Sequence, residues 1–138
     1  WINWHLSHQF ETNKAIIVAE EQNDEIIGYS ICLLKNVDKI NLKKAILLDL
    51  VALDDNDETY INLLLHSIKE TEKQECHLFE IVGFNNKKRK IINSLKPFLN
   101  KGSSFPFYFK SNNTKLNAIL LNEDSWDPSA LDGDSIQL

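Results

Sequence analysis

A nearly continuous apolar segment, followed at once by an amphipathic one, constrains the fold of this chain most. Residues 45–53 are apolar with the exception of Asp49, and four later apolar residues recur at helical spacing: Ile61, Leu64, Leu65 and Ile68. The first pattern predicts a central strand that is buried on both faces of a sheet. The second predicts a helix that covers this sheet, so the two segments indicate a strand-turn-helix unit.

The turn between these two segments is acidic. It reads Leu53-Asp54-Asp55-Asn56-Asp57-Glu58 and contains four acids and no glycine. A helix N-terminus at such a turn is suited to phosphate, because its N–H groups and the helix dipole attract an anion. The acidic side chains oppose that use, whereas Asn56 or Asp57 is suited to cap the helix.

The segments before the acidic turn predict strands and a short helix. Residues 15–19 and 25–34 are rich in β-branched side chains, and the turn at residues 22–24 predicts that they form a hairpin. Residues 36–44 are expected to form a polar connection to the long apolar strand. Residues 1–13 have loosely helical apolar spacing and predict a helical lead-in.

The segments after the acidic turn continue the α/β alternation. Residues 76–82 predict a fourth strand, and a second helix follows it, with one apolar face and Pro97 at its end. Residues 105–110 are aromatic and residues 115–121 alternate apolar and polar side chains, so both predict strands. Residues 122–138 predict an ordered tail.

The predicted order is therefore β-β-β-α-β-α-β-β. It indicates an α/β (α+β) fold, with a mixed, mostly antiparallel sheet flanked by helices. A length of 138 residues with 43 % hydrophobic residues is typical of one domain, residues 1–138.

Composition argues against several classes of function. The net charge is −5, and the single dense basic run, residues 87–90, is too short for a nucleic-acid surface. No apolar run approaches the roughly 18 residues of a membrane span, and the first residues of this sequence do not have the pattern of a signal peptide. From these two patterns we expect a cytoplasmic protein. Cys32 and Cys76 lack metal-ligand spacing, so we expect no metal site and buried thiols.

The predicted order, with an aromatic strand after the second helix, resembles the later two thirds of the GNAT acetyltransferase fold. The first strand and the pair of helices that precede the hairpin in that family are lacking. Because the chain begins at Trp1 and contains no Met, we expect it to be a fragment. Its opening residues 1–4, residues 48–50 and residues 126–134 resemble the C-terminal half of longer proteins that join two GNAT-like halves.

The family motif for the pyrophosphate of coenzyme A departs from its pattern in this chain. The motif Q/R-x-x-G-x-G/A falls on Asp57, Tyr60 and Asn62. Asp57 places negative charge where a diphosphate would lie. Tyr60 and Asn62 add side chains where the family has glycines that allow close backbone approach. The resemblance thus implies a degenerate pyrophosphate loop.

A second family pattern, N-x-x-A-x-x-x-Y-x-x-x-G-F, covers the last strand-helix unit. It falls on five residues here: Asn86, Arg89, Asn93, Pro97 and Phe98. The first Asn and the last Phe are kept, but Asn93 replaces the tyrosine general acid of the family. An amide has no proton to give to a thiolate near neutral pH.

The resemblance implies an N-acyltransferase that moves an acetyl or other acyl group from acyl-CoA to an unidentified amine. Asp49 and Glu80 interrupt apolar strands and are the candidates for the general base, because partial burial raises the pKa of a carboxylate. Structural hydrogen bonds are the alternative role for both. The candidate cofactor-binding residues are Val51, Ala52, Asn85 and Asn86.

Two alternatives to an active enzyme remain open. The chain is then a non-catalytic, degenerate GNAT-like module that serves as the structural or binding half of a larger protein, with an upstream GNAT-like half or a homo-oligomer as partner. Alternatively, it is an interaction domain whose surface around Trp1, Trp4 and Trp126 holds a partner chain.

Overall fold

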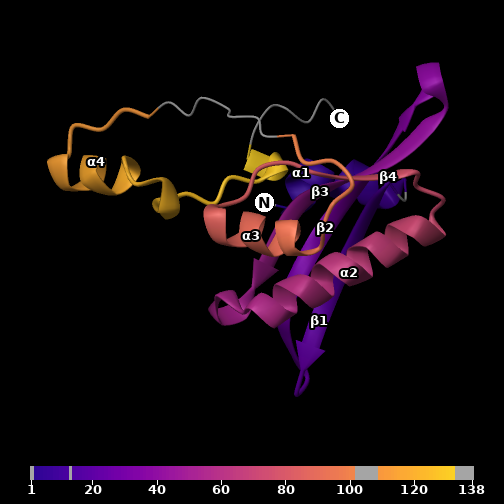
Figure 1. The fold of residues 1–138 in the computed structure, drawn as a ribbon, viewed down its shortest axis with the longest axis horizontal. Coiled ribbons are helices and arrows are strands. Elements are labelled where there is room, and N and C mark those ends of the chain that lie inside the picture. Colours follow the sequence, from indigo (N-terminus) through magenta and orange to yellow (C-terminus); the bar gives the residue numbers. More distant parts are fainter. Residues whose placement is uncertain (1, 13, 102–108, 133–138) are drawn as a thin grey trace. The chain divides into compact units, whose positions relative to one another are not determined.

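The computed structural model describes residues 2–12, 14–101 and 109–132 (Figure 1). Within them the chain divides into two compact units. One unit combines the residues up to Val82 with those from Ser129 onward, and the other comprises Gly83–Pro128. None of the helices in the described ranges has both the length and the hydropathy needed to cross a bilayer.

The first unit is built on a four-stranded sheet with the order β1-β2-β3-β4. Its strands are β1 (Ala15–Gln22), β2 (Glu25–Val37), β3 (Leu42–Ala52) and β4 (Leu78–Ile81). The first three strands pair antiparallel and β4 is parallel to β3, with α2 lying along the sheet (Figure 1). The predicted mixed, mostly antiparallel sheet is thus confirmed, and the predicted fourth strand is shorter than residues 76–82.

Both hairpins follow from turn residues that tolerate left-handed backbone. Asn23 and Asp24 have φ values of 53° and 64° and join β1 to β2, which confirms the predicted hairpin. The polar connection predicted at residues 36–44 is wrong. The connection consists only of the 3-10 turn η1 (Asp38–Ile40) and the left-handed Asn41. The polar residues on either side pair across β2 and β3, with side chains that are half-buried or, at Asn36, exposed.

The sheet is buried on both faces at its centre. One face packs against α2 (Asp57–Lys73), where Ser30 and Ser67 share a hydrogen bond of 2.6 Å. The other face forms a core cluster with α1 (Ile2–Glu11) and the 3-10 turn η4 (Ala130–Asp132): Leu6, Ile31, Leu33, Leu48 and Ala130. Leu47 and Leu48 are both 0 % exposed, which confirms the prediction of a strand covered on both faces.

Helix α2 presents a different face to the sheet from the one that its apolar spacing predicts. Leu65 and Ile68 are 49 % and 38 % exposed, and Leu64 alone of the predicted four is buried. The buried residues of α2 are Thr59, Tyr60, Leu63, Leu64, Ser67 and Thr71. Small hydroxyl side chains allow the helix to approach the sheet closely. Their hydrogen-bonding groups find partners within the helix, since Ser67 donates to the carbonyl of Leu63 at 2.7 Å.

The second unit contains helices α3 (Asn86–Ser94) and α4 (Thr114–Leu120) and the 3-10 turn η3 (Glu123–Ser125). Helix α3 begins where the sequence predicts it. The strand predicted at residues 115–121 is wrong, because Asn113 caps a helix there by accepting from the N–H groups of Lys115 and Leu116. In the aromatic strand predicted at residues 105–110, Phe109 and Lys110 are irregular and residues 105–108 lie outside the described residues.

The predicted tail is described as far as Asp132. In the second unit, the indole N–H of Trp126 donates to the carbonyl of Leu120 at 2.8 Å, and its ring lies 6.1 Å from that of Phe109. In the first unit, Leu131 packs against the core cluster. Trp126 is therefore half-buried by local contacts. Trp1 and the side chain of Trp4 lie outside the described residues.

Candidate active site

Strand β4 ends before β3 does, so the last part of β3 has no β4 residues beside it. Their parallel register runs from Lys44 opposite Leu78 to Leu47 opposite Ile81, where β4 ends. On its other side β3 stays paired to β2 as far as Ala52. Among the residues that the structure describes, no strand therefore lies beside Leu48–Ala52 on the β4 side. A strand edge of this kind presents main-chain groups to a ligand.

A β-bulge lies at the start of this edge segment. Ile31 is opposite Asp49 and Cys32 is opposite Leu47, so Leu48 is an additional residue in β3. Bulges bend a strand and change the direction of its side chains. Since cross-strand partners share a face of the sheet, Asp49 lies on the same face as Ile31, the face that α1 and η4 cover.

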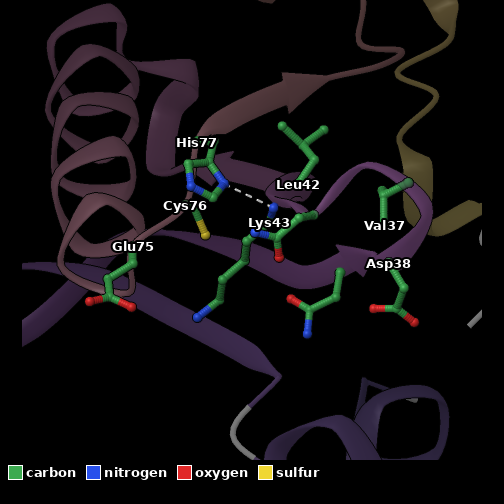
Figure 2. A pocket seen from close by; sticks show the side chains of 9 residues that line it. Val37, Asp38, Leu42, Lys43, Glu75, Cys76 and His77 are labelled. Carbon is green, nitrogen blue, oxygen red and sulfur yellow. Dashed lines mark hydrogen bonds between the residues drawn. The ribbon is translucent and has the colours of Figure 1, made fainter.

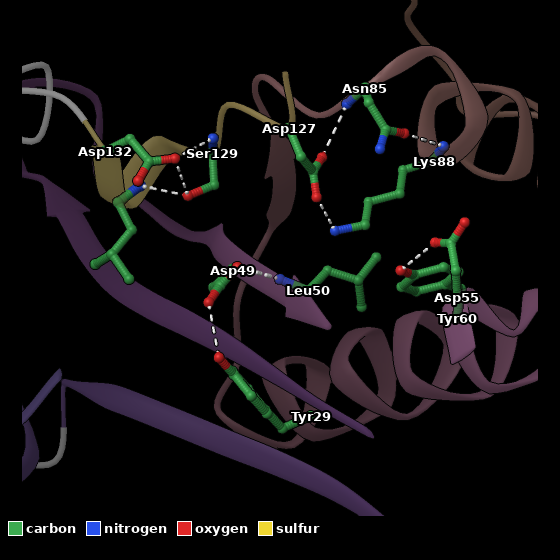
Figure 3. A network of polar contacts seen from close by, with 11 residues as sticks. Tyr29, Asp49, Leu50, Asp55, Tyr60, Asn85, Lys88, Asp127, Ser129 and Asp132 are labelled. Carbon is green, nitrogen blue, oxygen red and sulfur yellow. Dashed lines mark hydrogen bonds and ion pairs between the residues drawn. The ribbon is translucent and has the colours of Figure 1, made fainter. Parts of the chain in front are cut away.

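Hydrogen bonds to both of its carboxylate oxygens hold Asp49 (Figure 3). Its Oδ1 accepts from the backbone N–H of Leu50 at 2.9 Å, and its Oδ2 accepts from the hydroxyl of Tyr29 at 3.1 Å. Both Asp49 and Tyr29 are half-buried. Burial raises the pKa of Tyr29, and the charge and hydrogen bond of Asp49 raise it further, so this hydroxyl is a donor at neutral pH.

Glu80 lies on the same face as Asp49 but in a different environment. It is opposite Ile46, which in turn is opposite Leu33 of the core cluster. Its carboxylate forms an ion pair of 2.5 Å with the ammonium of Lys44. The structure thus brings the two candidate bases to one face, and the pairing with Lys44 gives Glu80 the structural role that the sequence left open.

The two candidate backbone donors follow Asp49 along the edge of β3. Val51 is opposite Tyr29 and Ala52 is opposite Gly28. Gly28 has to be a glycine, because a Cβ there would lie 2.7 Å from Cγ2 of Thr59 and 2.9 Å from the carbonyl oxygen of Val51. This close approach packs the start of α2 against β2 and β3, next to the edge.

The acidic turn forms a 3-10 turn, and one of its own side chains caps helix α2. It forms the 3-10 turn η2 (Leu53–Asp55), in which Asp54 and Asp55 have φ values of 52° and 55°. Of the two candidate caps, Asn56 or Asp57, the structure selects Asn56, which accepts from the N–H of Thr59 at 3.0 Å. Asp57 and Glu58 add negative charge in the first turn, which the helix dipole stabilises.

The side chains at the family's two glycine positions take part in structural hydrogen bonds. Tyr60 is 3 % exposed, and its hydroxyl donates to Oδ1 of Asp55 at 2.7 Å (Figure 3). Asn62 donates to Oε1 of Glu20 in β1 at 3.0 Å. Both side chains connect α2 to neighbouring segments of the first unit. They also occupy space where the family pattern requires small residues.

In the second unit, Asn85 and Asn86 organise the start of α3. Asn85 caps the helix by accepting from the N–H of Lys88 at 2.9 Å, and its own N–H donates to Asp127 at 3.1 Å. Asp127 also forms an ion pair with the buried ammonium of Lys88 (Figure 3). Asn86 donates to Asp124 at 3.1 Å. These two candidate cofactor-binding residues thus make contacts with residues 124–127.

A hollow of about 570 Å³ lies at the other end of β3 (Figure 2). It is lined by polar residues that include Lys43, Glu75 and Cys76, and His77 beside them accepts a hydrogen bond at Nδ1 from the backbone of Lys43 at 3.0 Å. Cys76 is a free thiol that is only partly buried, contrary to the expectation of a buried one. No group of potential metal ligands occurs among the described residues.

Sequence reasoning missed Tyr29 and Asp127. The sequence pattern around Tyr29 indicates only a strand, and its contact with Asp49 depends on the register of β2 against β3. Asp127 is 39 residues from Lys88 in the sequence, so its ion pair carries no local signal. Alternation along the hairpin offered a partial signal, since it places Tyr29 and Ile31 on one face of β2.

No protein-family model and no curated protein matches this sequence. Among solved structures, an aminoglycoside acetyltransferase from an uncultured soil metagenomic sample, in complex with trehalose, is similar, with 12% identity and a TM-score of 0.66 over 78% of this chain and 74% of that one. A predicted acetyltransferase with acetyl-CoA from Clostridium acetobutylicum has 11% identity and a TM-score of 0.62, over 78% and 72%.

A ribosomal-protein-alanine N-acetyltransferase from Brucella melitensis biovar Abortus 2308 is also similar, with 12% identity and a TM-score of 0.56 over 78% of this chain and 80% of that one. At such low identity the likeness concerns the fold. The mixed, mostly antiparallel sheet with its flanking helices agrees with it. The chain has a GNAT-like fold.

Proposed function

We propose that this chain is an N-acyltransferase that moves an acyl group from an acyl-CoA thioester to an amine. The observation that carries the proposal is the edge of β3 at Leu48–Ala52, where an oriented carboxylate, Asp49, precedes main-chain groups that β4 does not cover. The three similar solved structures named above are described as acetyltransferases, and one of them is described with acetyl-CoA.

The proposed reaction is direct attack of the amine on the thioester. The amine nitrogen forms a bond to the carbonyl carbon, the C–S bond breaks, and the thiolate leaves with the electron pair. The carboxylate of Asp49 accepts the proton that the nitrogen loses. An N–H group of Val51 or Ala52 donates to the carbonyl oxygen as negative charge develops on it. We assign the base to Asp49 because Glu80 is paired with Lys44.

The acidic turn fits the diphosphate of an acyl-CoA donor poorly. Its four acids are exposed, and a like charge about 4 Å away costs roughly 1 kcal/mol even in water. In the first turn of α2, the N–H of Thr59 already donates to the side chain of Asn56. We infer that the donor is held chiefly by its acyl and pantetheine parts along β3, so that coenzyme A itself binds weakly.

Titration calorimetry with two donors tests this function. Acetyl-CoA and S-acetyl-pantetheine, which lacks the diphosphate, are expected to bind with similar, millimolar affinities, and both should acetylate amines from a mixed panel. The variant Asp49→Asn should bind both donors and transfer from both far more slowly. Absence of binding and of transfer with both donors, in a folded sample, would remove the proposal.

The non-catalytic module is the second candidate, and one observation favours it. Every position of the pyrophosphate motif carries a side chain that opposes a diphosphate or forms a structural contact: Asp57, Tyr60 and Asn62. In that case neither donor binds, and the function lies in association with a GNAT-like half or a second copy. Sedimentation of the full-length protein would then show a stable complex.

A further inference from the structure

Tyr29 is placed to act on the proposed base. It lies on β2 opposite Val51, and the next residue on the same face of β2, Ile31, is opposite Asp49. Tyr29 and Asp49 are therefore diagonal neighbours on one face of the sheet, within reach of a long aromatic side chain. The hydroxyl of Tyr29 donates to Oδ2 of Asp49 at 3.1 Å (Figure 3).

The two oxygens of Asp49 have different donors. Oδ1 accepts from the backbone N–H of Leu50 and Oδ2 accepts from Tyr29. Contacts to both oxygens fix the rotation of the carboxylate about its Cβ–Cγ bond. Both contacts also favour the ionised form, because a proton on Oδ2 would compete with the hydroxyl of Tyr29.

We propose that Tyr29 is the positioning residue of Asp49: its hydroxyl holds the carboxylate in the orientation and the ionised state in which it accepts the amine proton. This inference rests on the proposed acyl transfer. Tyr29 keeps its own proton throughout and only donates a hydrogen bond. Burial and the neighbouring charge raise the pKa of Tyr29, so the hydroxyl remains a donor across the neutral range.

Other charged groups also belong to the elements around this face. Across β3 and β4 the face carries the Lys44–Glu80 ion pair. Of the two elements that cover it, α1 contributes His8 and Glu11 among its described side chains, and η4 contributes Asp132, whose carboxylate accepts from the N–H of Ser129 at 2.8 Å. Variants that leave these groups intact isolate the effect of Tyr29.

The first experiment measures the pKa of Asp49 by carboxyl ¹³C NMR in the native chain and in Tyr29→Phe. Loss of one hydrogen bond to the ionised form should raise the pKa of Asp49 by about 0.5 to 1 unit. Tyr60→Phe is the matched control, since it removes another tyrosine–aspartate hydrogen bond, to Asp55, and should leave the Asp49 resonance unchanged. An Asp49 pKa that is the same in Tyr29→Phe overturns the inference.

The second experiment follows the acetylation rate against pH. The acidic limb of kcat/KM should move to higher pH in Tyr29→Phe by the same amount as the Asp49 pKa, with KM for the donor unchanged. A lower rate with an unmoved limb assigns Tyr29 a merely structural role and overturns the inference. If the native chain transfers no acyl group, the proposed function fails and the catalytic part of the inference with it, whatever the NMR titration shows.

A reciprocal variant covers the case in which Tyr29→Phe does not fold. Asp49→Asn removes the charge that helps to raise the pKa of Tyr29. The alkaline titration of tyrosinate absorbance should then contain one tyrosine that ionises at lower pH than in the native chain. An unchanged titration contradicts the coupling between the two side chains.

Discussion

The edge of β3 and the start of α2 are adjacent in the sequence but differ in what they retain. The edge keeps a bulge, an oriented Asp49 and main-chain groups beyond the end of β4. The helix start keeps only the shape of a phosphate-binding turn. Asn56 accepts from the N–H of Thr59, and Asp55 accepts from the hydroxyl of Tyr60. Packing thus maintains the same fold at both places, whereas the proposed function assigns chemistry to the edge alone.

The edge should be the more sensitive of the two regions to a single change. Asp49→Asn removes the proposed proton acceptor and should lower kcat by about 10² to 10⁴-fold, the usual range for a general base. Donor affinity by calorimetry should not change. Glu21→Gln, an exposed acid in β1, is the control and should retain activity. A native kcat in Asp49→Asn would contradict the assignment of the proton acceptor to this edge.

Packing beneath both regions should respond next. Leu63 is 0 % exposed in α2, so Leu63→Ala should lower the free energy of unfolding by about 2 to 5 kcal/mol. Leu65→Ala, two positions along on the exposed side of the helix, should change it by less than about 0.5 kcal/mol. Urea denaturation measures both. Equal losses of stability in the two variants would mean that Leu65 is buried, as the apolar spacing alone predicts.

Alkaline pH tests the same frame without a mutation. Burial raises the pKa of Cys32 from 9.0 to about 12, partly opposed by a hydrogen bond to Ser67. The folded state therefore holds this proton more tightly than the unfolded state, and its contribution to stability is complete below pH 9 and lost as pH rises toward 12. Denaturation at pH 8 and pH 11 should show a fall that Cys32→Ala reduces and that Cys76→Ala, at a partly exposed site, reduces less.

Patterns that depend on one segment predicted the fold well. The apolar run around Leu47 and Leu48 identified a strand buried on both faces, and Asn56 identified the start of α2. Short segments failed where two periods fit the same residues: Leu116, Ile119 and Leu120 suit a helix as well as a strand, and the cap at Asn113 decides for the helix.

The site was predictable only in part, for a related reason. Asp49 stands out because a charge interrupts an apolar strand. Its partner Tyr29 does not, since their contact follows from the bulge at Leu48, which shifts the register of β3 against β2 by one residue. Likewise the pairing of Glu80 with Lys44 depends on a parallel register between strands that a helix separates in the sequence.

A charge reversal at the helix start should sharpen the contrast between the regions. Asp57→Arg restores the positive charge of the family motif and should raise the affinity for acetyl-CoA about tenfold, because the interaction with a diphosphate changes by about 1 to 2 kcal/mol. Binding of S-acetyl-pantetheine should stay the same. Glu72→Arg, at the far end of α2, is the control and should alter neither affinity. An unchanged acetyl-CoA affinity in Asp57→Arg would place the diphosphate away from this turn.

The smallest expected effect concerns the cap of α2. Asn56→Ala removes the acceptor for the N–H of Thr59 and should lower the free energy of unfolding by about 1 kcal/mol. Acetyl-CoA gains an open donor group in return, so its affinity should rise slightly while stability falls. Asn85→Ala removes the equivalent cap of α3 in the second unit and should cost similar stability. If Asn56→Ala loses stability without any gain in affinity, the acids alone account for the poor fit of this turn to a diphosphate.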